Sequence, residues 1–372
     1  MQPLKITKVS VKDFRNIENI EINLCENANI IYGDNGQGKT NFLEALWMFT
    51  GAKSFRGVRD SELVRFGQDC ASLGLSFYGA GRDQTAELMI NGHRKASLNE
   101  IALRSPTELA GHFCAVVFSP AHLALVKSGP KEKRRFIDEA ICQIKPKYIH
   151  ILNQFNRVLD QRNRLLKEGP YGSHFQDMLE IWDARMASFS AVIIKTRDSF
   201  LKRMKPAAQE VYAGISQSRE PLDFSYVSTL ECNPEEEIPQ IEETLRRQLK
   251  INRQEDIRAR VTNGGPHRDD VEIQLDGKSA RLYGSQGQQR SCVLALKLAE
   301  CQMIYETIGE YPVILLDDVM SELDVSRRDY LLNHLRDRQI IMTCCDKAYF
   351  KRLGKGVSVK LQKGSVIYSR YY

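Results

Sequence analysis

Apolar and polar positions alternate in several short stretches of the chain, and this period of two predicts β-strands. These stretches cover residues 6–11, 20–24, 73–78, 85–90 and 271–275. Asn91-Gly92 follows one of them and Asp276-Gly277 another, and both dipeptides favour hairpins because their residues tolerate positive φ. An uninterrupted apolar run before Tyr32 is typical of a buried strand. We therefore expect strands towards both ends of the chain, with an antiparallel layer around residues 73–92.

Apolar residues recur every three or four positions from about residue 130 to residue 257, which predicts helices. We expect breaks at Gly169-Pro170-Tyr171-Gly172, at Lys205-Pro206 and in the polar stretch 216–240. No heptad pattern persists, which argues against a long coiled-coil arm. Because 372 residues exceed the usual size of one domain, a head with an insertion is expected. The predicted parts are the head at residues 1–125 and 261–372, and an inserted, mainly helical lobe at 126–260.

A glycine-rich segment directly follows the buried strand and matches the phosphate-binding pattern G-x-x-x-x-G-K-T. It is followed by a predicted helix that begins near Asn41. Backbone N–H groups of such a loop and the positive end of the helix converge on phosphate oxygens. The predicted nucleotide-binding residues are Gly33, Asp34, Asn35, Gly36, Gln37, Gly38, Lys39, Thr40 and Asn41. Lys39 would supply a positive charge for the outer phosphates, and Thr40 a hydroxyl for Mg²⁺. The alternative is a simple glycine-rich turn.

A second apolar run, at residues 312–316, ends in two carboxylates. A buried central strand delivers acidic side chains to the phosphate end of a sheet in this way. Asp317 is therefore a candidate ligand of Mg²⁺, and Asp318 a candidate polariser or general base for the attacking water. Such runs are common, and it is the preceding phosphate loop that favours this interpretation.

The segment Ser285, Gln286, Gly287 and Gln288 opens another predicted helix about 25 residues before the acidic strand. A serine hydroxyl and glycine backbone at a helix N-terminus can donate to phosphate oxygens. The segment contains no lysine. We therefore expect it to complete a nucleotide site and not to hold a nucleotide unaided. Glycine and glutamine turns of no functional importance are the alternative.

Charge is unevenly distributed along the chain. The net charge is only +6, but residues 127–205 contain 17 Lys and Arg against 9 Asp and Glu. This basic region could bind a polyanion such as DNA, or it could be a solvated helical face.

The nine cysteines are odd in number and none has C-x-x-C spacing, which fits a reducing compartment. The first residues lack the apolar core of a signal peptide, and no later apolar run reaches eighteen residues. A cytoplasmic location without a membrane partner is expected.

The three motifs together resemble the ATP-binding-cassette ATPases, whose signature loop closes over the nucleotide held by a second protomer. The long insertion between the motifs resembles the DNA-repair branch of that superfamily. Further matching strings are found at residues 13–16, 53–56, 130–138, 265–270 and 315–324. On these strings the chain resembles the RecF family of bacterial recombination and gap-repair ATPases over essentially its full length.

This resemblance implies a fold, cofactors and partners. The fold would be an α/β cassette head with a mixed sheet and an antiparallel β layer. The cofactors would be ATP and Mg²⁺, and ATP would join two chains into a homodimer. The DNA substrate would be gapped or a single-strand/double-strand junction, bound largely without sequence preference. The implied role is to help load RecA together with RecO and RecR, in support of the SOS response and replication restart.

The resemblance also assigns roles to side chains outside the three motifs. Ser321, Glu322, Leu323 and Asp324 would form a loop that couples the two sites across the dimer, although a polar helix cap is the simpler interpretation. Arg56, Arg134 and Arg135 are candidates for contact with DNA or nucleotide. Arg56 could instead solvate a loop. His267, Arg268 and Asp269 could be a hydrogen-bonded turn.

Three positions depart from the family pattern. Ala121 replaces an acidic residue, and no glutamine nearby is available to sense magnesium. Thr343 and the two cysteines after it stand where a switch histidine is usual, so Thr343 could sense the γ-phosphate. Asp318 is one methylene shorter than the usual glutamate, which predicts slow ATP hydrolysis. Stimulation of this hydrolysis by DNA is expected from the resemblance. The alternatives are an ATP-binding DNA scaffold with negligible hydrolysis, or the ATPase subunit of another cassette system.

Overall fold

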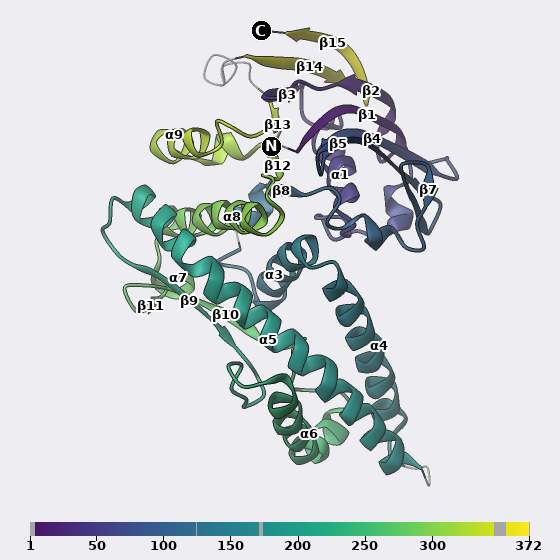
Figure 1. The fold of residues 1–372 in the computed structure, drawn as a ribbon, viewed down its shortest axis with the longest axis vertical. Coiled ribbons are helices and arrows are strands. Elements are labelled where there is room, and N and C mark those ends of the chain that lie inside the picture. Colours follow the sequence, from purple (N-terminus) through teal and green to yellow (C-terminus); the bar gives the residue numbers. More distant parts are fainter. Residues whose placement is uncertain (1–3, 124, 171–173, 346–354, 372) are drawn as a thin grey trace.

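The computed structural model describes residues 4–123, 125–170, 174–345 and 355–371. Two sheets form a head, and the helices α4, α5 and α6 extend from it as a lobe (Figure 1). Across the described ranges, no helix has an apolar stretch of the length and hydropathy needed to cross a bilayer.

A mixed sheet carries the phosphate loop. Its strands lie in the order β15-β14-β3-β13-β12-β8, parallel to one another except for the outer β15. Their bounds are β3 Ala28–Tyr32, β8 Ala115–Phe118, β12 Val313–Asp317, β13 Ile340–Cys344, β14 Gly356–Gln362 and β15 Ser365–Tyr371. Strands β3, β8, β12 and β13 are largely apolar and are buried along their length, because layers cover both faces of a parallel sheet. All of these parallel strands point their carboxyl ends to one edge.

An antiparallel sheet forms the second layer of the head, in the order β2-β1-β4-β5-β6-β7. Its strands are β1 Lys5–Phe14, β2 Ile17–Asn23, β4 Ala71–Gly79, β5 Arg82–Ile90, β6 Arg94–Leu98 and β7 Ile101–Ala102. Helix α1, Lys39–Trp47, contacts β1 of this sheet and β12 and β13 of the mixed sheet. The predicted antiparallel layer and the hairpin at Asn91-Gly92 are confirmed.

Helices build the lobe and the lower side of the head. Their bounds are α2 Pro120–Leu123, α3 Pro130–Ile144, α4 Lys147–Glu168, α5 Phe175–Ser216, α6 Ile238–Ala259, α7 Ala280–Tyr283, α8 Gln286–Ile308 and α9 Val325–His334. Helix α5 packs on α4 and α6 in the lobe and on α8 in the head. One long helix therefore reaches from the lobe to the segment that opens with Ser285 (Figure 1).

The predicted break at Lys205-Pro206 is wrong, because α5 continues through Pro206 for a further ten residues. Proline removes one helical hydrogen bond and crowds the carbonyl four residues before it, at a cost of about 3 kcal/mol. Pro206 is exposed, so water can solvate the carbonyl that loses its partner. Met204 and Ala208 on either side are buried, and this packing maintains the helix.

A small antiparallel sheet joins the sequence before and after residue 260. Strand β9, Leu222–Val227, pairs with β10, Asp270–Leu275, which forms the predicted Asp276-Gly277 hairpin with β11, Lys278–Ser279. The division of the chain between residues 260 and 261 stays a prediction, and this sheet crosses it.

A cluster of buried charged side chains connects the three lobe helices. Arg162 of α4 is fully buried and donates to Asp183 of α5 and to Asp256 of α6, at 2.8 Å each. It also donates to Thr262 at 2.7 Å. Both carboxylates are buried as well, and Arg162 is their common cationic partner, although Asp183 also accepts from Arg253 of α6 at 2.6 Å.

We predict that Arg162→Met lowers the free energy of unfolding by about 3–5 kcal/mol, because two buried carboxylates lose their common partner. Urea unfolding followed by circular dichroism measures the change. Arg164→Met on the same helix is the matched control, since Arg164 is exposed and pairs only with Glu168 among the described residues. Equal effects of the two substitutions would contradict the assigned importance of the cluster.

Candidate nucleotide-binding site

The phosphate loop follows β3 directly and passes into α1, which begins at Lys39, two residues before the predicted start. Gly36 and Gly38 adopt positive φ of 77° and 100°. Side chains rarely tolerate this conformation, so the glycines allow successive N–H groups to turn inwards. A Cβ at Gly33 would overlap the carbonyl oxygen of Leu361, so only glycine allows β14 to approach this closely.

The turn between β14 and β15 also touches the phosphate loop. The N–H of Gly364 donates to the carbonyl of Gln37 at 3.2 Å, and the N–H of Lys363 donates to the Gln37 side chain at 2.5 Å. A turn more than 300 residues after the phosphate loop thus helps to fix the conformation of that loop.

Lys39 is folded against the loop that precedes it. Its Nζ donates to the carbonyl oxygens of Gly33 at 2.6 Å and Asp34 at 2.9 Å, and its side chain is nearly buried. It also lies 3.3 Å from the sulfur of Cys345. The ammonium group is therefore held at the mouth of the glycine loop, as binding of the outer phosphates requires.

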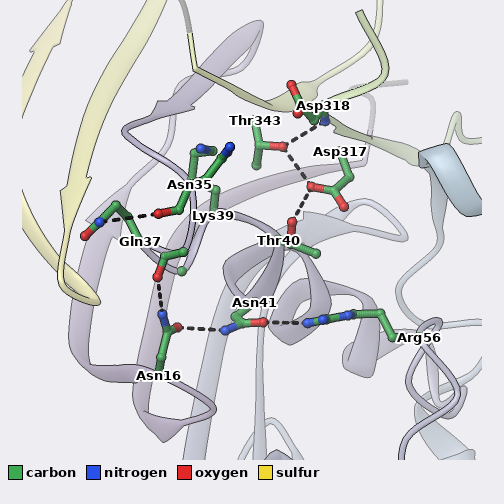
Figure 2. Close-up of a pocket in the computed structure, with 12 residues that line it drawn as sticks. Asn16, Asn35, Gln37, Lys39, Thr40, Asn41, Arg56, Asp317, Asp318 and Thr343 are labelled. Atoms are coloured by element: carbon green, nitrogen blue, oxygen red, sulfur yellow. Dashed lines mark hydrogen bonds between the residues drawn. The ribbon is translucent and has the colours of Figure 1, made fainter. Parts of the chain in front are cut away.

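Thr40, Asp317 and Thr343 meet at the carboxyl edge of the mixed sheet (Figure 2). The hydroxyls of Thr40 and Thr343 donate to Asp317 Oδ1 at 2.8 and 2.9 Å. Burial raises the pKa of Asp317, as does the nearby charge of Asp318, and the two hydroxyl hydrogen bonds oppose this shift. A hydroxyl and a carboxylate oxygen are suitable ligands for Mg²⁺, so the donor set fits that ion.

Asp318 lies one residue beyond β12 with φ of 49°, and its N–H donates to the Thr343 hydroxyl at 3.0 Å. The Thr343 hydroxyl thus hydrogen-bonds to two consecutive residues at the end of β12, Asp317 and Asp318. This position supports the expectation that Thr343 takes the place of a switch residue, which stays a prediction.

One open cavity of about 280 Å³ brings the phosphate loop and the acidic strand together. Its lining comprises Asn16, Asn35, Gly36, Gln37, Gly38, Lys39, Thr40, Asn41, Arg56, Asp317, Asp318 and Thr343. The signature residues are not among these described lining residues. Seven of the nine predicted nucleotide-loop residues, all but Gly33 and Asp34, therefore line one cavity with the two acidic-strand residues, whereas Ser285 lines another.

Asn16 was not predicted as a site residue, yet it braces the phosphate loop. Its amide donates to the carbonyl of Gly36 at 2.7 Å, and its oxygen accepts from Asn41 at 2.7 Å. Asn41 in turn accepts from Arg56 at 2.8 Å (Figure 2). The family string at residues 13–16 contained Asn16, but a lone asparagine after a strand carried no sign of its role.

Glu44 is a second unpredicted residue, fully buried in α1. Arg15 donates to both of its carboxylate oxygens, at 3.0 and 3.1 Å, and Ser54 donates to one of them. The Ser54 carbonyl accepts from Arg135 of α3 at 2.7 Å. A continuous set of polar contacts therefore connects the phosphate-loop helix to α3.

The signature segment begins α8. The Ser285 hydroxyl accepts from the N–H of Gln288 at 3.2 Å, and the Gln288 side chain accepts from the N–H of Ser285 at 2.8 Å. Gln288 also donates to Glu220, just beyond α5, at 3.2 Å. Ser285 and Gln288 line a separate polar cavity of about 470 Å³, shared with Tyr212 and Arg327. Gln286 lines a third cavity.

The predicted coupling loop lies between β12 and α9. The hydroxyl of Ser321 donates to the Asp318 carbonyl at 2.7 Å, which connects this loop to the acidic strand. Asp324 caps α9 by accepting from the N–H of Arg327 at 2.9 Å. A helix cap is thus present at Asp324, and a role in coupling two sites stays a prediction.

The candidate DNA contacts differ in their surroundings. Arg56 lines the nucleotide cavity. Arg134 is half-buried and donates to the carbonyl of Asp269 at 2.5 Å, and Arg135 donates to Glu139 at 2.8 Å. DNA contact by these three arginines stays a prediction.

Part of the charge in the basic region is internal. Lys133, Arg162 and Arg197 are buried and pair with carboxylates, so they are unavailable to a surface polyanion. Asp269 is also buried and accepts from the backbone and hydroxyl of Thr229 at 2.7 Å each. The N–H groups of Arg268 and Asp269 donate to the carbonyl of Gly265 at 2.8 and 3.2 Å, so a hydrogen-bonded turn is present here.

The AAA ATPase domain family matches residues 4–168 of the chain. A DNA replication and repair protein RecF from Acetivibrio thermocellus is 38% identical over 98% of this chain and its own full length. A DNA replication and repair protein RecF from Ruminiclostridium cellulolyticum is 38% identical over 94% of this chain and 94% of its own length. A solved structure of the recombination mediator protein RecF-ATP in the RecFOR pathway aligns with a TM-score of 0.90 and 34% identity, covering 100% of this chain and 98% of its own.

A Pyrococcus furiosus Smc head domain has a TM-score of 0.54 at 16% identity, covering 99% of this chain and 96% of its own, which shows a common fold alone. The phosphate loop, the acidic strand and the full-length identity to the two bacterial relatives together show that this chain belongs to the RecF family.

Proposed function

We propose that this protein is an ATP-dependent DNA-binding protein of recombinational repair and replication restart. In this proposal, ATP joins two chains on gapped or junction DNA, and slow hydrolysis, stimulated by DNA, separates them. Relatives described as DNA replication and repair proteins, and a structure described as RecF-ATP, support the class of activity.

The observation that carries the proposal is the separation of the two phosphate-binding elements within one chain. Lys39 and Thr40 line one cavity, and Ser285 lines another. Among the described residues, the serine and glycine backbone at the start of α8 share no cavity with the phosphate loop of their own chain. A second chain, placed with its phosphate loop opposite Ser285, would complete each site, and two nucleotides would then stabilise the dimer.

The chain's own residues have distinct roles in the proposed hydrolysis. The glycine loop and Lys39 bind and orient the phosphates, and Thr40 and Asp317 would hold Mg²⁺, which offsets phosphate charge when bound. Asp318 orients the attacking water and accepts its proton. Its position is set by the Thr343 hydroxyl that receives the Asp318 N–H.

The proposed partners follow from the relatives. A solved relative is described as a recombination mediator in the RecFOR pathway, which supports RecO and RecR as partners. RecA loading as the outcome is part of the proposal. Support for the SOS response and a cytoplasmic location belong to the same proposal. Contact with DNA would be made mainly to phosphates, because no base-reading motif is present in the sequence.

We predict that Lys39→Ala raises the ATP concentration needed for dimerisation roughly 10- to 100-fold, because the loss of a charged hydrogen bond weakens ATP binding by about 1.5–3 kcal/mol. Sedimentation velocity with and without ATP and Mg²⁺ measures the dimer. Lys278→Ala, at an exposed lysine of β11, is the control. Undiminished dimerisation of Lys39→Ala in ATP would reject the nucleotide as the bridging element.

We predict that Asp318→Asn still dimerises with ATP but releases phosphate about 10²- to 10⁴-fold more slowly than wild type, because the general base is lost. Phosphate release in the presence of DNA measures the difference, with Asp337→Asn as an exposed control. Equal rates near background for both proteins would instead identify a scaffold that barely hydrolyses ATP, and equal rates well above background would exclude Asp318 as the base.

DNA binding is predicted to weaken steeply as salt rises, because it would depend on phosphate contacts, and to vary little with base sequence. Fluorescence anisotropy with duplex, single-stranded and gapped DNA, in ATP, ADP and no nucleotide, at two salt concentrations, tests this. The tightest binding is expected on gapped DNA in ATP. An affinity that is insensitive to both salt and nucleotide would count against the proposal.

A further inference from the structure

Arginines bind the predicted coupling loop, Ser321 to Asp324, to the helices that flank it. Arg290 of α8 donates to the carbonyl of Glu322, and to the Glu322 carboxylate at 2.8 Å. Arg327 of α9 donates to the Asp324 carboxylate. Arg328 donates to the carbonyl of Leu323 at 2.8 Å. Three consecutive residues of the loop therefore each accept from an arginine side chain.

Two of these arginines also belong to the signature helix or touch it. Arg290 lies one helical turn after Gln286, and these two residues line the same cavity. Arg327 donates to the hydroxyl of Ser291 at 2.8 Å, and a Cβ on Gly287 would lie 3.0 Å from its guanidinium. The coupling loop and the signature segment are thus bridged on two sides, by Arg290 and by Arg327.

Stability alone is a poor explanation for this arrangement. The side chains of Arg290 and Glu322 are 36% and 42% exposed, and those of Arg327 and Asp324 are 24% and 51% exposed. Ion pairs with this much access to water contribute little to folding stability. These bonds do fix the position of the coupling loop relative to the first turns of α8, because the Arg327 guanidinium contacts both elements.

We propose that Arg290 and Arg327 are positioning residues that join the coupling loop and the signature segment into one unit, so that both reach the partner's nucleotide together. This inference rests on the proposed two-chain site. It assigns the two arginines to the site in the partner chain and not to the phosphate loop of their own chain. Misplacement of the signature by even 1 Å would lower the rate strongly.

The first test compares the double variant Arg290→Ala/Arg327→Ala with wild type and with Arg336→Ala, an exposed arginine just beyond α9. The double variant is expected to need roughly tenfold more ATP for half-maximal hydrolysis and to lose most of its rate. Its urea midpoint is expected to match wild type. Arg327→Lys should recover only part of the rate, because an ammonium retains the charge but lacks the fork that reaches Asp324 and Ser291. Full activity of the double variant overturns the proposal.

Complementation in mixed dimers provides the decisive test. Asp318→Asn supplies intact arginines but no base, and the double variant supplies an intact base but no bridging arginines. In an equal mixture about half of the dimers contain one chain of each kind, and each such dimer has one complete site of its two. Up to about a quarter of the wild-type rate is therefore expected to return. If the arginines served only their own chain, or only its folding, the mixture would stay inactive and the inference would fail.

A control mixture separates this failure from failure of the proposed dimer. Ser285→Arg mixed with Asp318→Asn should recover activity in the same way, because Ser285 also acts on the partner's nucleotide. Recovery in the control but not with the arginine variant overturns the positioning role alone. No recovery in either mixture overturns the two-chain site, and the positioning role with it.

Discussion

The parallel pairing of β12 with β13 is the constraint on which the candidate site depends. In this register Asp317 lies opposite Thr343, so the carboxylate and the hydroxyl meet at the strand ends, where Thr40 of α1 completes the triad. A slip of one residue would turn Asp317 to the opposite face of the sheet. The apolar strands around it therefore do more than form a core, because their burial fixes the register that brings the oxygen ligands together.

Two separate sets of contacts connect the helical part of the chain to the phosphate-loop helix and to the signature segment. At one boundary, Glu44 of α1 is linked through Ser54 to Arg135 of α3. At the other, Glu220 beyond α5 accepts from Gln288 of the signature segment. Helix α5 also packs along α8 and the lobe helices (Figure 1). The helical part of the chain thus contacts the phosphate-loop helix and the signature segment through different residues.

Local sequence signals predicted those parts of the molecule whose structure is decided locally. The phosphate loop and the acidic strand were visible because glycine spacing and a continuous apolar run each determine conformation over a few residues. Asn16 and Glu44 were missed as site residues because their importance comes from partners distant in the sequence. The predicted break at Pro206 failed for a related reason, since packing on both sides of the proline overrides its local effect. DNA contacts could not be derived either, since buried pairing removes some of the positive charges that composition counts.

The position of β3 has a consequence for how this protein is made. Both neighbours of β3 in the sheet, β13 and β14, come from the last part of the chain, and Leu361 packs against Gly33. During synthesis the phosphate-loop strand therefore emerges from the ribosome more than 300 residues before either of its pairing partners. Until then the backbone N–H and C=O groups on both sides of β3 lack their strand partners. This slows folding and makes a nascent or truncated chain prone to aggregation. ATP binding is consequently a property that the polypeptide can acquire only after β13 and β14, residues 340–362, have been synthesised.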